Sequence, residues 1–446
     1  MLTLESAARR FSEKFATSAR LTAEGRAVIP GGYSRTSFNF GPHAVFVESG
    51  HGAYIDTVDG HRLLDLNNNF TVNILGHGNQ AISDALVTAI PSGTSFGNPV
   101  AEEAELARIL IDRVASIDMV QFSCSASESV MSAVRVARAF TGRTLIAKFE
   151  GGYHGFTDPV SVSAHPHGGE EYGSDSNPRP VADSEGIPAA VVEHVVMLTQ
   201  NDDAGTERIL RDHADELACV IVELESGAGG HVVLREDFVQ MLRRVTAELG
   251  ILLVIDETMT LRASFHGMQN TYGIDADITV MGKIIGGGLP LGAIGGRADI
   301  MRVLADGRVP ISGTHHGHRL ALIAGIACMT ALDEVAYDRL NSMAARILSE
   351  VGEWTAARKS PFTIFGSGYS SLAYAYCVQP GMTVQTQRDH WRNVDAEKTQ
   401  TFSLELANRG FFPVARGEFS LSLAMTDDDI ASYIETVKEI IIDIEA

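Results

Sequence analysis

The chain has 446 residues, more than the roughly 250–300 that one hydrophobic core organises, so we expect two domains. Asp and Glu number 56 against 35 Lys and Arg, and the net charge of −21 argues against nucleic acid and anionic membranes as partners. Hydrophobic residues make up 45% and charged residues 20%, which excludes an intrinsically disordered chain.

The N-terminal residues MLTLESAARRFSEKF predict an amphipathic helix and lack the apolar core of a signal peptide. No apolar run is as long as a membrane span, and the four cysteines form no CxxC pair, so we expect a cytoplasmic protein with reduced thiols. After a Gly-Pro-rich segment at 30–32, two short strands are predicted at 44–50 and 53–60, with a hairpin turn at 58–61.

Beyond residue 100, short apolar runs alternate with helical stretches, which predicts βα units around a mostly parallel sheet in an α/β fold. The predicted strands are nearly continuously apolar, as strands buried on both faces are, and lie at 119–125, 144–150, 219–225, 252–257 and 278–282. Helices are predicted at 127–142, with Ser127 as N-cap, and at 235–250, ending in Gly250. Residues 155–190 predict a long loop, and the last hundred residues predict an α+β lobe.

Residues with reactive or polar side chains stand at the ends of four of these strands. Cys124–Glu128 run from the first strand into a helix, and Tyr153 and His154 follow the second. Asp256 ends the strand at 252–257, and Lys283 follows the strand at 278–282. Ligands of parallel sheets bind beyond the carboxyl ends of the strands, so these groups converge on one crevice if the strands are neighbours.

This combination of side chains has a specific chemical meaning. A lysine amine can form a Schiff base with an aldehyde cofactor, and an aspartate can hold a pyridine nitrogen protonated. An aromatic ring can stack on the cofactor, and a helix N-terminus can bind its phosphate. Taken singly, Lys283 is typical of a solvated loop and Asp256 of a turn, but together the residues predict a site for pyridoxal 5′-phosphate (PLP).

Several stretches resemble the class III, fold-type I PLP-dependent aminotransferases. The strongest signal is the block GKIIGGGLPLGAIGGR at 282–297, and the others are SASESVMSAVRVARAFTGRTLIAKFEGGYHG, VIVELESGAGG, YIDTVDGHRLLDL and ILGHGN. The resemblance covers residues 25 to 435 and is nearest to the glutamate-1-semialdehyde aminomutase-like branch, which also contains β-amino-acid aminotransferases such as β-phenylalanine aminotransferase. It implies a PLP-dependent transferase of fold type I that acts as a homodimer.

The resemblance also implies roles for matching residues. Lys283 would form the Schiff base and later carry the proton, Asp256 would pair with the pyridine nitrogen, and Tyr153 would stack on the ring. The remaining cofactor-binding positions are Ser125, Ala126 and Ser127 at the phosphate, Glu223 and Thr258 near the ring, and Thr314, which would reach the phosphate in the neighbouring subunit.

Arginines are the candidates for binding a substrate carboxylate, because the guanidinium fork donates two parallel hydrogen bonds. Arg35, in IPGGYSRTSF, matches an arginine with this role in the β-phenylalanine aminotransferases. Arg262 and Arg416 are alternatives, and Arg416-Gly417 resembles an Arg-Gly pair in the terminal lobe of this branch. A surface arginine without a substrate is the competing interpretation of Arg35.

The sequence departs from the family pattern at three places. The family's Asn-Ser-Gly-Thr-Glu turn reads Cys124–Glu128 here, and Ala126 fits only if its φ is negative. Thr258 replaces the usual Val and adds a hydroxyl behind the ring, and Gly317-His318-Arg319 replaces Gly-Asn-Pro. His315 and His316 suggest a metal, but without nearby partners we expect none.

We therefore expect an N-terminal segment at 1–65, a large PLP-binding domain at 66–330 and a small C-terminal domain at 331–446. The predicted activity is transfer of an amino group between an amino acid, of which a β-amino acid is one option, and a keto acid by a ping-pong mechanism. A semialdehyde 2,1-aminomutase and another PLP reaction such as racemisation are alternative enzymes. A PLP-binding protein without catalysis is the alternative that retention of Lys283, Asp256 and Tyr153 argues against.

Overall fold

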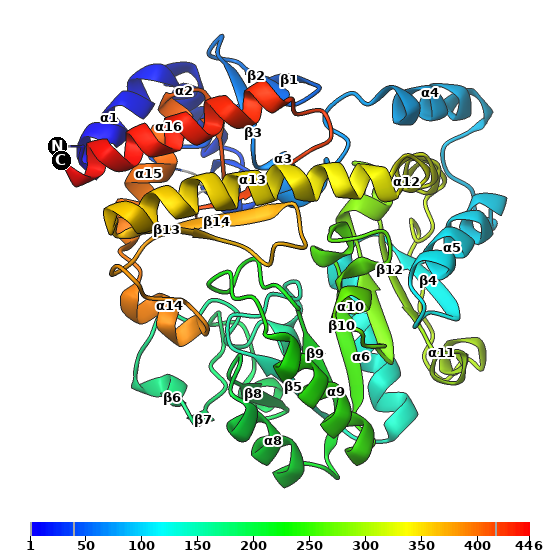
Figure 1. The fold of residues 1–446 in the computed structure, drawn as a ribbon. Coiled ribbons are helices and arrows are strands. Elements are labelled where there is room, and N and C mark those ends of the chain that lie inside the picture. Colours follow the sequence, from blue (N-terminus) through cyan, green and yellow to red (C-terminus); the bar gives the residue numbers. More distant parts are fainter. Residues whose placement is uncertain (1, 39–40, 415–416) are drawn as a thin grey trace. The chain divides into compact units, whose positions relative to one another are not determined.

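The computed structural model describes residues 2–38, 41–414 and 417–446, and Figure 1 labels its helices and strands. The chain divides into two compact units, of which the first spans Met1–Gln80, Asp338–Met382 and Asn393–Ala446 and the second spans Ala81–Tyr337 and Thr383–Arg392. The domain boundaries expected after residues 65 and 330 stay a prediction, and the units of the structure change after residues 80 and 337.

Over the described residues, the second unit is built on a seven-stranded sheet. Its spatial order is β4 (Met119–Ser123), β12 (Gly292–Gly296), β11 (Ile278–Met281), β10 (Leu252–Asp256), β9 (Leu217–Val222), β5 (Leu145–Phe149) and β8 (Val195–Leu198). The strands from β11 to β8 pair in parallel, and β12 pairs antiparallel with both β11 and β4. The five predicted strands and the mostly parallel sheet are confirmed.

Successive residues of the central strands face two separate cores. Leu253 packs with residues of α9 (Glu236–Leu249) on one face, and Val254 packs with residues of α6 (Ala126–Thr141) on the other. Because side chains alternate between the faces of a strand, a sheet covered by helices on both faces needs apolar residues at every position. This explains the continuous apolar runs in the sequence.

Helix α6 begins before the predicted position. Its N-cap is Ser125 rather than Ser127, and the Ser125 Oγ accepts the Glu128 N–H at 3.3 Å. Ala126 is the first residue of the helix and does not have a positive φ, which is the condition under which alanine can replace glycine. The predicted end of α9 is confirmed, because Gly250 has the left-handed φ of 64°.

Two strands of this sheet, β8 and β12, were not predicted from the sequence. β12 contains three glycines, and glycine is depleted in strands, so its composition conceals it. The close packing requires this composition: a Cβ on Gly292 would lie 2.3 Å from the carbonyl carbon of Ser125, and one on Gly296 would lie 2.6 Å from the carbonyl oxygen of Asp277.

Helices and short elements complete the second unit. The helices are α4 (Gln80–Ala89), α5 (Ala101–Arg113), α7 (Ala189–Val192), α8 (Asp203–Asp212), α10 (Gly267–Thr271), α11 (Ala298–Ala305), α12 (Arg319–Ala331) and α14 (Gln387–Asn393). The predicted loop at 155–190 is confirmed as irregular, and its elements are two or three residues long: η4 (Asp158–Val160), η5 (Glu170–Tyr172), β6 (Gly173–Ser174) and β7 (Asn177–Pro178).

A buried ion pair attaches the segment 383–392 to the second unit. The Nε and Nη2 atoms of Arg388 donate to the two carboxylate oxygens of Glu150 at 2.7 and 2.8 Å. The side chains are 2% and 0% exposed, so only such a two-bond geometry offsets the cost of removing both charges from water.

The first unit combines two sheets with six helices over the described residues. One sheet is ordered β1 (Val47–His51), β2 (Tyr54–Thr57), β3 (Arg62–Asp65) and β15 (Phe411–Phe412), and the other is β13 (Phe362–Phe365), β14 (Leu372–Cys377) and β16 (Glu418–Ser420). The helices are α1 (Leu4–Lys14), α2 (Ala16–Gly25), α3 (Asn68–Thr71), most of α13 (Glu334–Arg358), α15 (Ala396–Asn408) and α16 (Asp427–Glu445). The predicted N-terminal helix and the hairpin between β2 and β3 are confirmed, and β15 pairs in parallel with β3.

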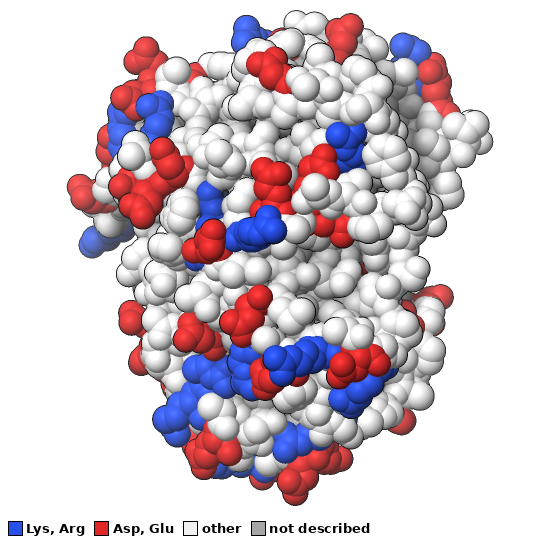
Figure 2. All heavy atoms as spheres, turned by 90° about the vertical axis from the view of Figure 1, so that its right-hand side faces the viewer, with Lys and Arg blue, Asp and Glu red and all other residues white. Residues whose placement is uncertain are grey.

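The surface carries charges of both signs, in keeping with 35 basic and 56 acidic residues. On the face drawn in Figure 2, basic side chains lie beside acidic ones. In the described part of the chain, no single helix is both long and apolar enough to cross a membrane, although the bent pair α12 and α13 passes that test of length and composition when taken together.

Candidate active site

A buried carboxylate and imidazole lie at the carboxyl end of the central strand of the second unit. Asp256 ends β10 and is 4% exposed, and His154 follows β5 and is 2% exposed. The His154 Nδ1 and the Asp256 Oδ2 are 2.9 Å apart, and the N–H of Thr258 donates to the Asp256 Oδ1 at 3.0 Å. Both carboxylate oxygens are therefore held by hydrogen bonds.

The histidine is held in its neutral form. Burial lowers the pKa of His154, the Asp256 carboxylate opposes this shift, and the Lys148 ammonium adds to it. A carboxylate can only accept, so a neutral His154 carries its proton on Nδ1 and donates it to Asp256. Its Nε2 is then a buried hydrogen-bond acceptor, and no described residue donates a hydrogen bond to it.

A second carboxylate, Glu223, directly follows β9. Burial raises the pKa of Glu223 to about 8, and the negative charge of Asp256 adds to the rise. The N–H of Tyr153 donates to the Glu223 Oε2 at 2.9 Å, and together with the positive charge of Lys283 it opposes the shift. At neutral pH the protonated form of Glu223 is favoured, so the two neighbouring carboxyl groups carry one negative charge.

Lys283 lies beyond β11 in a conformation that is rare for its residue type. Its φ is 54°, in the left-handed region, and the preceding Gly282 is packed closely. A Cβ on Gly282 would lie 3.0 Å from the Cβ of Ala126 and 3.3 Å from the Cγ2 of Thr258. The lysine is thereby fixed beside the N-terminus of α6 and the residue that caps Asp256. Strained backbone of this kind is concentrated at functional positions.

The N-terminus of α6 is an electropositive end of the site. The first N–H groups of a helix have no partner within it, and the helix dipole favours an anion there. Backbone packs closely against this end, since a Cβ on Gly155 would lie 2.4 Å from the Oγ of Ser127. The Glu128 Oε2 accepts the N–H of Cys124 at 2.7 Å, which fixes the entry to the helix.

The second unit thus brings together most residues that the sequence predicts for the site. The residues that contacts and charge interactions connect are Lys283, Asp256, Glu223, Tyr153, Thr258 and the turn Ser125–Ser127. Tyr153 is 40% exposed, as a ring that stacks on a bound group must be before that group binds. Its ring centroid lies 5.6 Å from that of His165.

Other predicted residues lie elsewhere. Thr314 is exposed in the loop before α12, and Arg262 is 0% exposed in the interior of the second unit, where its charge lowers the pKa of Tyr337 against the effect of burial. Arg416 lies outside the described residues.

His316 has neighbours that the sequence does not reveal. Its Nε2 lies 3.6 Å from the Glu128 Oε2, and potential ligand atoms of His316, Glu128 and Cys124 all lie within 4.8 Å of one another. The expectation that the protein has no metal stays a prediction.

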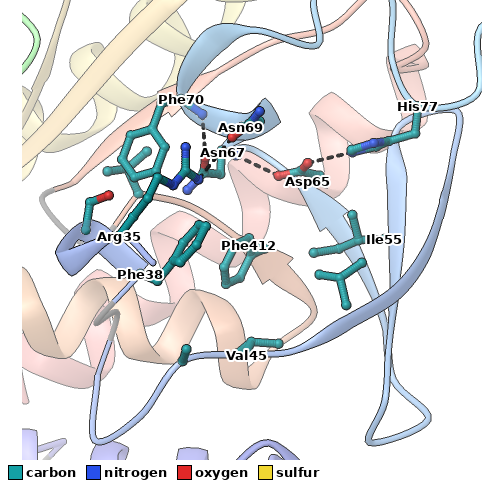
Figure 3. Close-up of a pocket in the computed structure, with 14 residues that line it drawn as sticks. Arg35, Phe38, Val45, Ile55, Asp65, Asn67, Asn69, Phe70, His77 and Phe412 are labelled. Atoms are coloured by element: carbon teal, nitrogen blue, oxygen red, sulfur yellow. Dashed lines mark hydrogen bonds and ion pairs between the residues drawn. The ribbon is translucent and has the colours of Figure 1, made fainter. Parts of the chain in front are cut away.

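Arg35 belongs to the first unit, where it lines a pocket of about 340 Å³. Its Nη2 donates to the Asn69 Oδ1 at 3.1 Å, and its guanidinium carbon lies 4.0 Å from the ring centroid of Phe38 and 5.2 Å from that of Phe70 (Figure 3). Burial lowers the pKa of Arg35. The pocket floor is mainly apolar and includes Val45, Ile55, Phe412 and Val414.

Two features of these sites, the role of His154 and the turn that contains Asn69, were not predicted from the sequence. His154 stands beside Tyr153 in the turn after a strand, and this position was the only local signal of its role. Asn69 is the last of three consecutive asparagines, a residue type that tolerates positive φ, and this is the signal of the unusual turn described below.

The second unit fits a bound group that carries both an anion and a protonated ring nitrogen. Two buried polar atoms, the His154 Nε2 and the Thr258 Oγ1, have no hydrogen-bond partner among the described residues. A buried polar atom left unpaired costs about 1–3 kcal/mol, so a ligand that reaches these atoms or organises water around them is expected.

Comparisons with known proteins agree with this geometry. Residues 37–366 match the family model described as "Aminotransferase class-III". The chain is 35% identical over 420 residues to glutamate-1-semialdehyde 2,1-aminomutase 2 of Geobacillus kaustophilus, which covers 93% of this chain and 95% of that protein. Among solved structures, an omega-transaminase from Sphaerobacter thermophilus has a TM-score of 0.89 and 33% identity, covering 96% of this chain and 98% of that one. A β-phenylalanine aminotransferase from Variovorax paradoxus has a TM-score of 0.88 and 31% identity, covering 99% and 97%.

The raised pKa of Glu223 predicts a pH dependence of stability in the cofactor-free protein. Between the ordinary value of 4.5 and about 8, the folded state keeps a proton that the unfolded state has released, so this group makes the free energy of unfolding fall as pH rises. Glu223→Gln removes this contribution. The difference in unfolding free energy, variant minus wild type, should therefore grow with pH across this window, by at most about 1.4 kcal/mol per pH unit.

Denaturant unfolding at several pH values from 5 to 9 measures this difference. Subtracting wild type from variant cancels the other groups that titrate in both proteins. A difference that is constant with pH would show that Glu223 keeps an ordinary pKa.

Proposed function

We propose that this chain, which belongs to the class III aminotransferases, moves an amino group between an amino acid and a keto acid by a ping-pong mechanism. Its fold is that of the fold-type I PLP-dependent transferases, and its cofactor is pyridoxal phosphate. The resemblance stated from the sequence motifs is thereby confirmed. The observation that carries the proposal is the buried Asp256–His154 pair beside Lys283 at the carboxyl edge of one sheet.

Each cofactor-facing residue has a role that its surroundings support. When bound, PLP supplies an aldehyde that condenses with amines and a ring that withdraws electrons from the adjoining carbon. Asp256 would pair with the protonated ring nitrogen, because hydrogen bonds from His154 and the N–H of Thr258 fix the position of its carboxylate. The N-terminus of α6 would hold the phosphate, and the exposed ring of Tyr153 would stack on the cofactor.

Lys283 supplies the amine that anchors the cofactor and the base that moves the proton. With the cofactor bound, its Nζ would act as the general base that takes a proton from the substrate carbon and returns it to the cofactor. The left-handed backbone at Lys283, which follows the closely packed Gly282, restricts where this amine can be. Protonated Glu223 adds a hydrogen-bond donor near the ring without adding a second negative charge.

Arg35 is the residue we propose for the substrate carboxylate. Among the described residues no carboxylate pairs with it, so its charge is available to a ligand, and it lines the pocket beside the rings of Phe38 and Phe70. Complete burial makes Arg262 the weaker candidate. A carboxylate on the substrate fits amino acids, including β-amino acids.

Two further parts of the proposal concern assembly and location. The chain acts as a homodimer in which Thr314 reaches the cofactor phosphate of the neighbouring subunit, and the exposure of Thr314 supports this. A cytoplasmic location is supported by the free thiols, of which Cys219, Cys328 and Cys377 are buried.

A 2,1-aminomutase acting on a semialdehyde is the second candidate. The observation that favours it is the 35% identity over 420 residues to a protein named as such an aminomutase. The two reactions differ in their need for a second substrate, because a mutase shifts the amine within one molecule.

The requirement for a keto acid distinguishes these reactions. With an amino acid alone, the aminotransferase should form one equivalent of keto product per active site and then stop, since the cofactor must be restored by an acceptor. Adding pyruvate or 2-oxoglutarate should start continuous turnover, which mass spectrometry of the products measures. Lys283→Ala is the control and should abolish both phases. Continuous turnover of glutamate 1-semialdehyde without any acceptor would establish the mutase instead.

The role of Arg35 predicts a loss confined to acids. Losing a charge-assisted carboxylate pair costs on the order of 2–5 kcal/mol, so Arg35→Ala should lower kcat/KM for 3-amino-3-phenylpropanoate by roughly thirty-fold to several thousand-fold. The decarboxylated analogue, 1-phenylethylamine, should be little affected, and Arg35→Lys should recover part of the loss because an ammonium lacks the planar fork. Equal losses on both substrates would mean that Arg35 has a structural role and that the carboxylate is bound by another residue.

A further inference from the structure

The first unit contains a left-handed turn made entirely of non-glycine residues. The φ angles of Asn68, Asn69, Phe70 and Thr71, which form α3, are 48°, 53°, 53° and 77°. Left-handed backbone is unfavourable for an L-residue, and among non-glycine residues asparagine and aspartate adopt it most readily. Phe70 and Thr71 have no such tolerance, so the surrounding structure must impose the conformation.

Hydrogen bonds to Asp65 hold the start of this turn. The Asp65 Oδ1 accepts the N–H groups of Asn67 and Asn68, each at 2.9 Å, and its Oδ2 lies 2.7 Å from the Nε2 of His77. Figure 3 shows Asp65 between Asn67 and His77 at the wall of the pocket. One carboxylate thus joins β3 to the turn.

The interior of the turn is fixed by two asparagine side chains. Asn68 is 0% exposed, and its Nδ2 donates to the carbonyl oxygens of Asp65 and Ser420 at 3.0 and 2.9 Å. The Asn67 Oδ1 accepts the N–H of Phe70 at 2.7 Å. The conformation is therefore determined by several independent bonds, and the strain is retained in the folded protein.

The strained turn places Asn69 and Phe70 next to Arg35 in the pocket. The Asn69 Oδ1 accepts one N–H of the guanidinium at 3.1 Å, and the ring of Phe70 lies beside it (Figure 3). The direction of a side chain from the backbone depends on φ, so relaxing the turn to a right-handed conformation would carry both groups away from Arg35. The guanidinium has five N–H donors, and this contact occupies one of them.

We propose that Asn69 is a positioning residue that orients the Arg35 guanidinium for the substrate carboxylate, and that the left-handed turn exists to hold it there. This inference rests on the proposed function, because it takes Arg35 as the carboxylate-binding residue. A neutral amide suits this role: it accepts a hydrogen bond from the arginine without neutralising the charge that attracts the acid. An aspartate at the same position would form an ion pair with Arg35 and compete with the substrate.

Two substitutions separate the side chain of Asn69 from its backbone. Asn69→Gly keeps and relaxes the left-handed backbone, since glycine adopts positive φ freely, but removes the amide. It should raise KM for 3-amino-3-phenylpropanoate by about three- to ten-fold, because Arg35 keeps its charge and loses only one orienting hydrogen bond, with kcat unchanged and thermal stability equal or higher. Asn69→Asp should raise KM further, and added salt should reduce its effect because salt screens the competing ion pair.

A matched control and a binding assay make the test independent of turnover. Lys359→Gly introduces glycine at another left-handed position of the first unit, with φ 54°, outside the pocket, and should leave KM unchanged. Calorimetric titration of the PLP-loaded enzyme with 3-phenylpropanoate, a carboxylate without an amine, should show the same order of affinities: wild type and Lys359→Gly highest, then Asn69→Gly, then Asn69→Asp, with Arg35→Ala lowest.

The outcomes distinguish this inference from the proposed function. If Arg35→Ala weakens binding of the acid and both Asn69 variants bind like wild type, Asn69 does not position Arg35. If both Asn69 variants lose activity on acid and amine alike with a lower melting temperature, the turn is structural only. If Arg35→Ala binds 3-phenylpropanoate like wild type, the role of Arg35 itself is wrong.

Discussion

The hydrogen bond between His154 and Asp256 is the interaction on which the proposed cofactor site depends. Asp256 is 4% exposed, and a buried carboxylate needs hydrogen-bond donors, of which the imidazole Nδ1 and the Thr258 N–H supply two. The same charge has a second consequence, because it contributes to the rise of the Glu223 pKa to about 8. In the proposed site, Asp256 is the partner of the ring nitrogen, and the neighbouring Glu223 favours its neutral form at neutral pH.

Backbone strain marks both places where the proposed reaction meets its ligands. Of the nine described non-glycine residues with positive φ, one is Lys283 and four form the turn at 68–71. In each case close packing or several hydrogen bonds impose the conformation: Gly282 lies against Ala126 and Thr258, and Asp65 holds the turn. Strain at these positions fixes the backbone that carries the Lys283 amine and the Asn69 amide. Less conformational freedom is then lost when a ligand binds.

The sequence was sufficient for the fold class and for the residues at the ends of the strands. Continuous apolar runs predict strands covered on both faces, and the polar residues that follow them predict Asp256 and Lys283 as site residues, because parallel strands end at one edge. Strand β12 escaped because its glycines are required by long-range packing that a local pattern does not contain. The sequence predicts Ser127 as the N-cap of α6, but a second serine lies two residues earlier, and the hydrogen bond from the Glu128 N–H identifies Ser125 as the cap.

Other features could not be read from the sequence because their signal is not local. His154 gains its role from Asp256, which lies 102 residues away. The turn at 68–71 is imposed by partners as distant as Ser420, and the attachment of residues 383–392 to the second unit depends on the pair between Arg388 and Glu150.

The protonation state of the ring nitrogen tests the central claim most directly. The measurement is the nitrogen-15 chemical shift of the pyridine nitrogen in protein loaded with labelled PLP, at pH 7 to 8. The account predicts a protonated nitrogen in the wild type and an unprotonated one in Asp256→Asn, since an amide lacks the charge that holds the proton. An unprotonated nitrogen in the wild type, or a protonated one in both proteins, would show that Asp256 is not its partner.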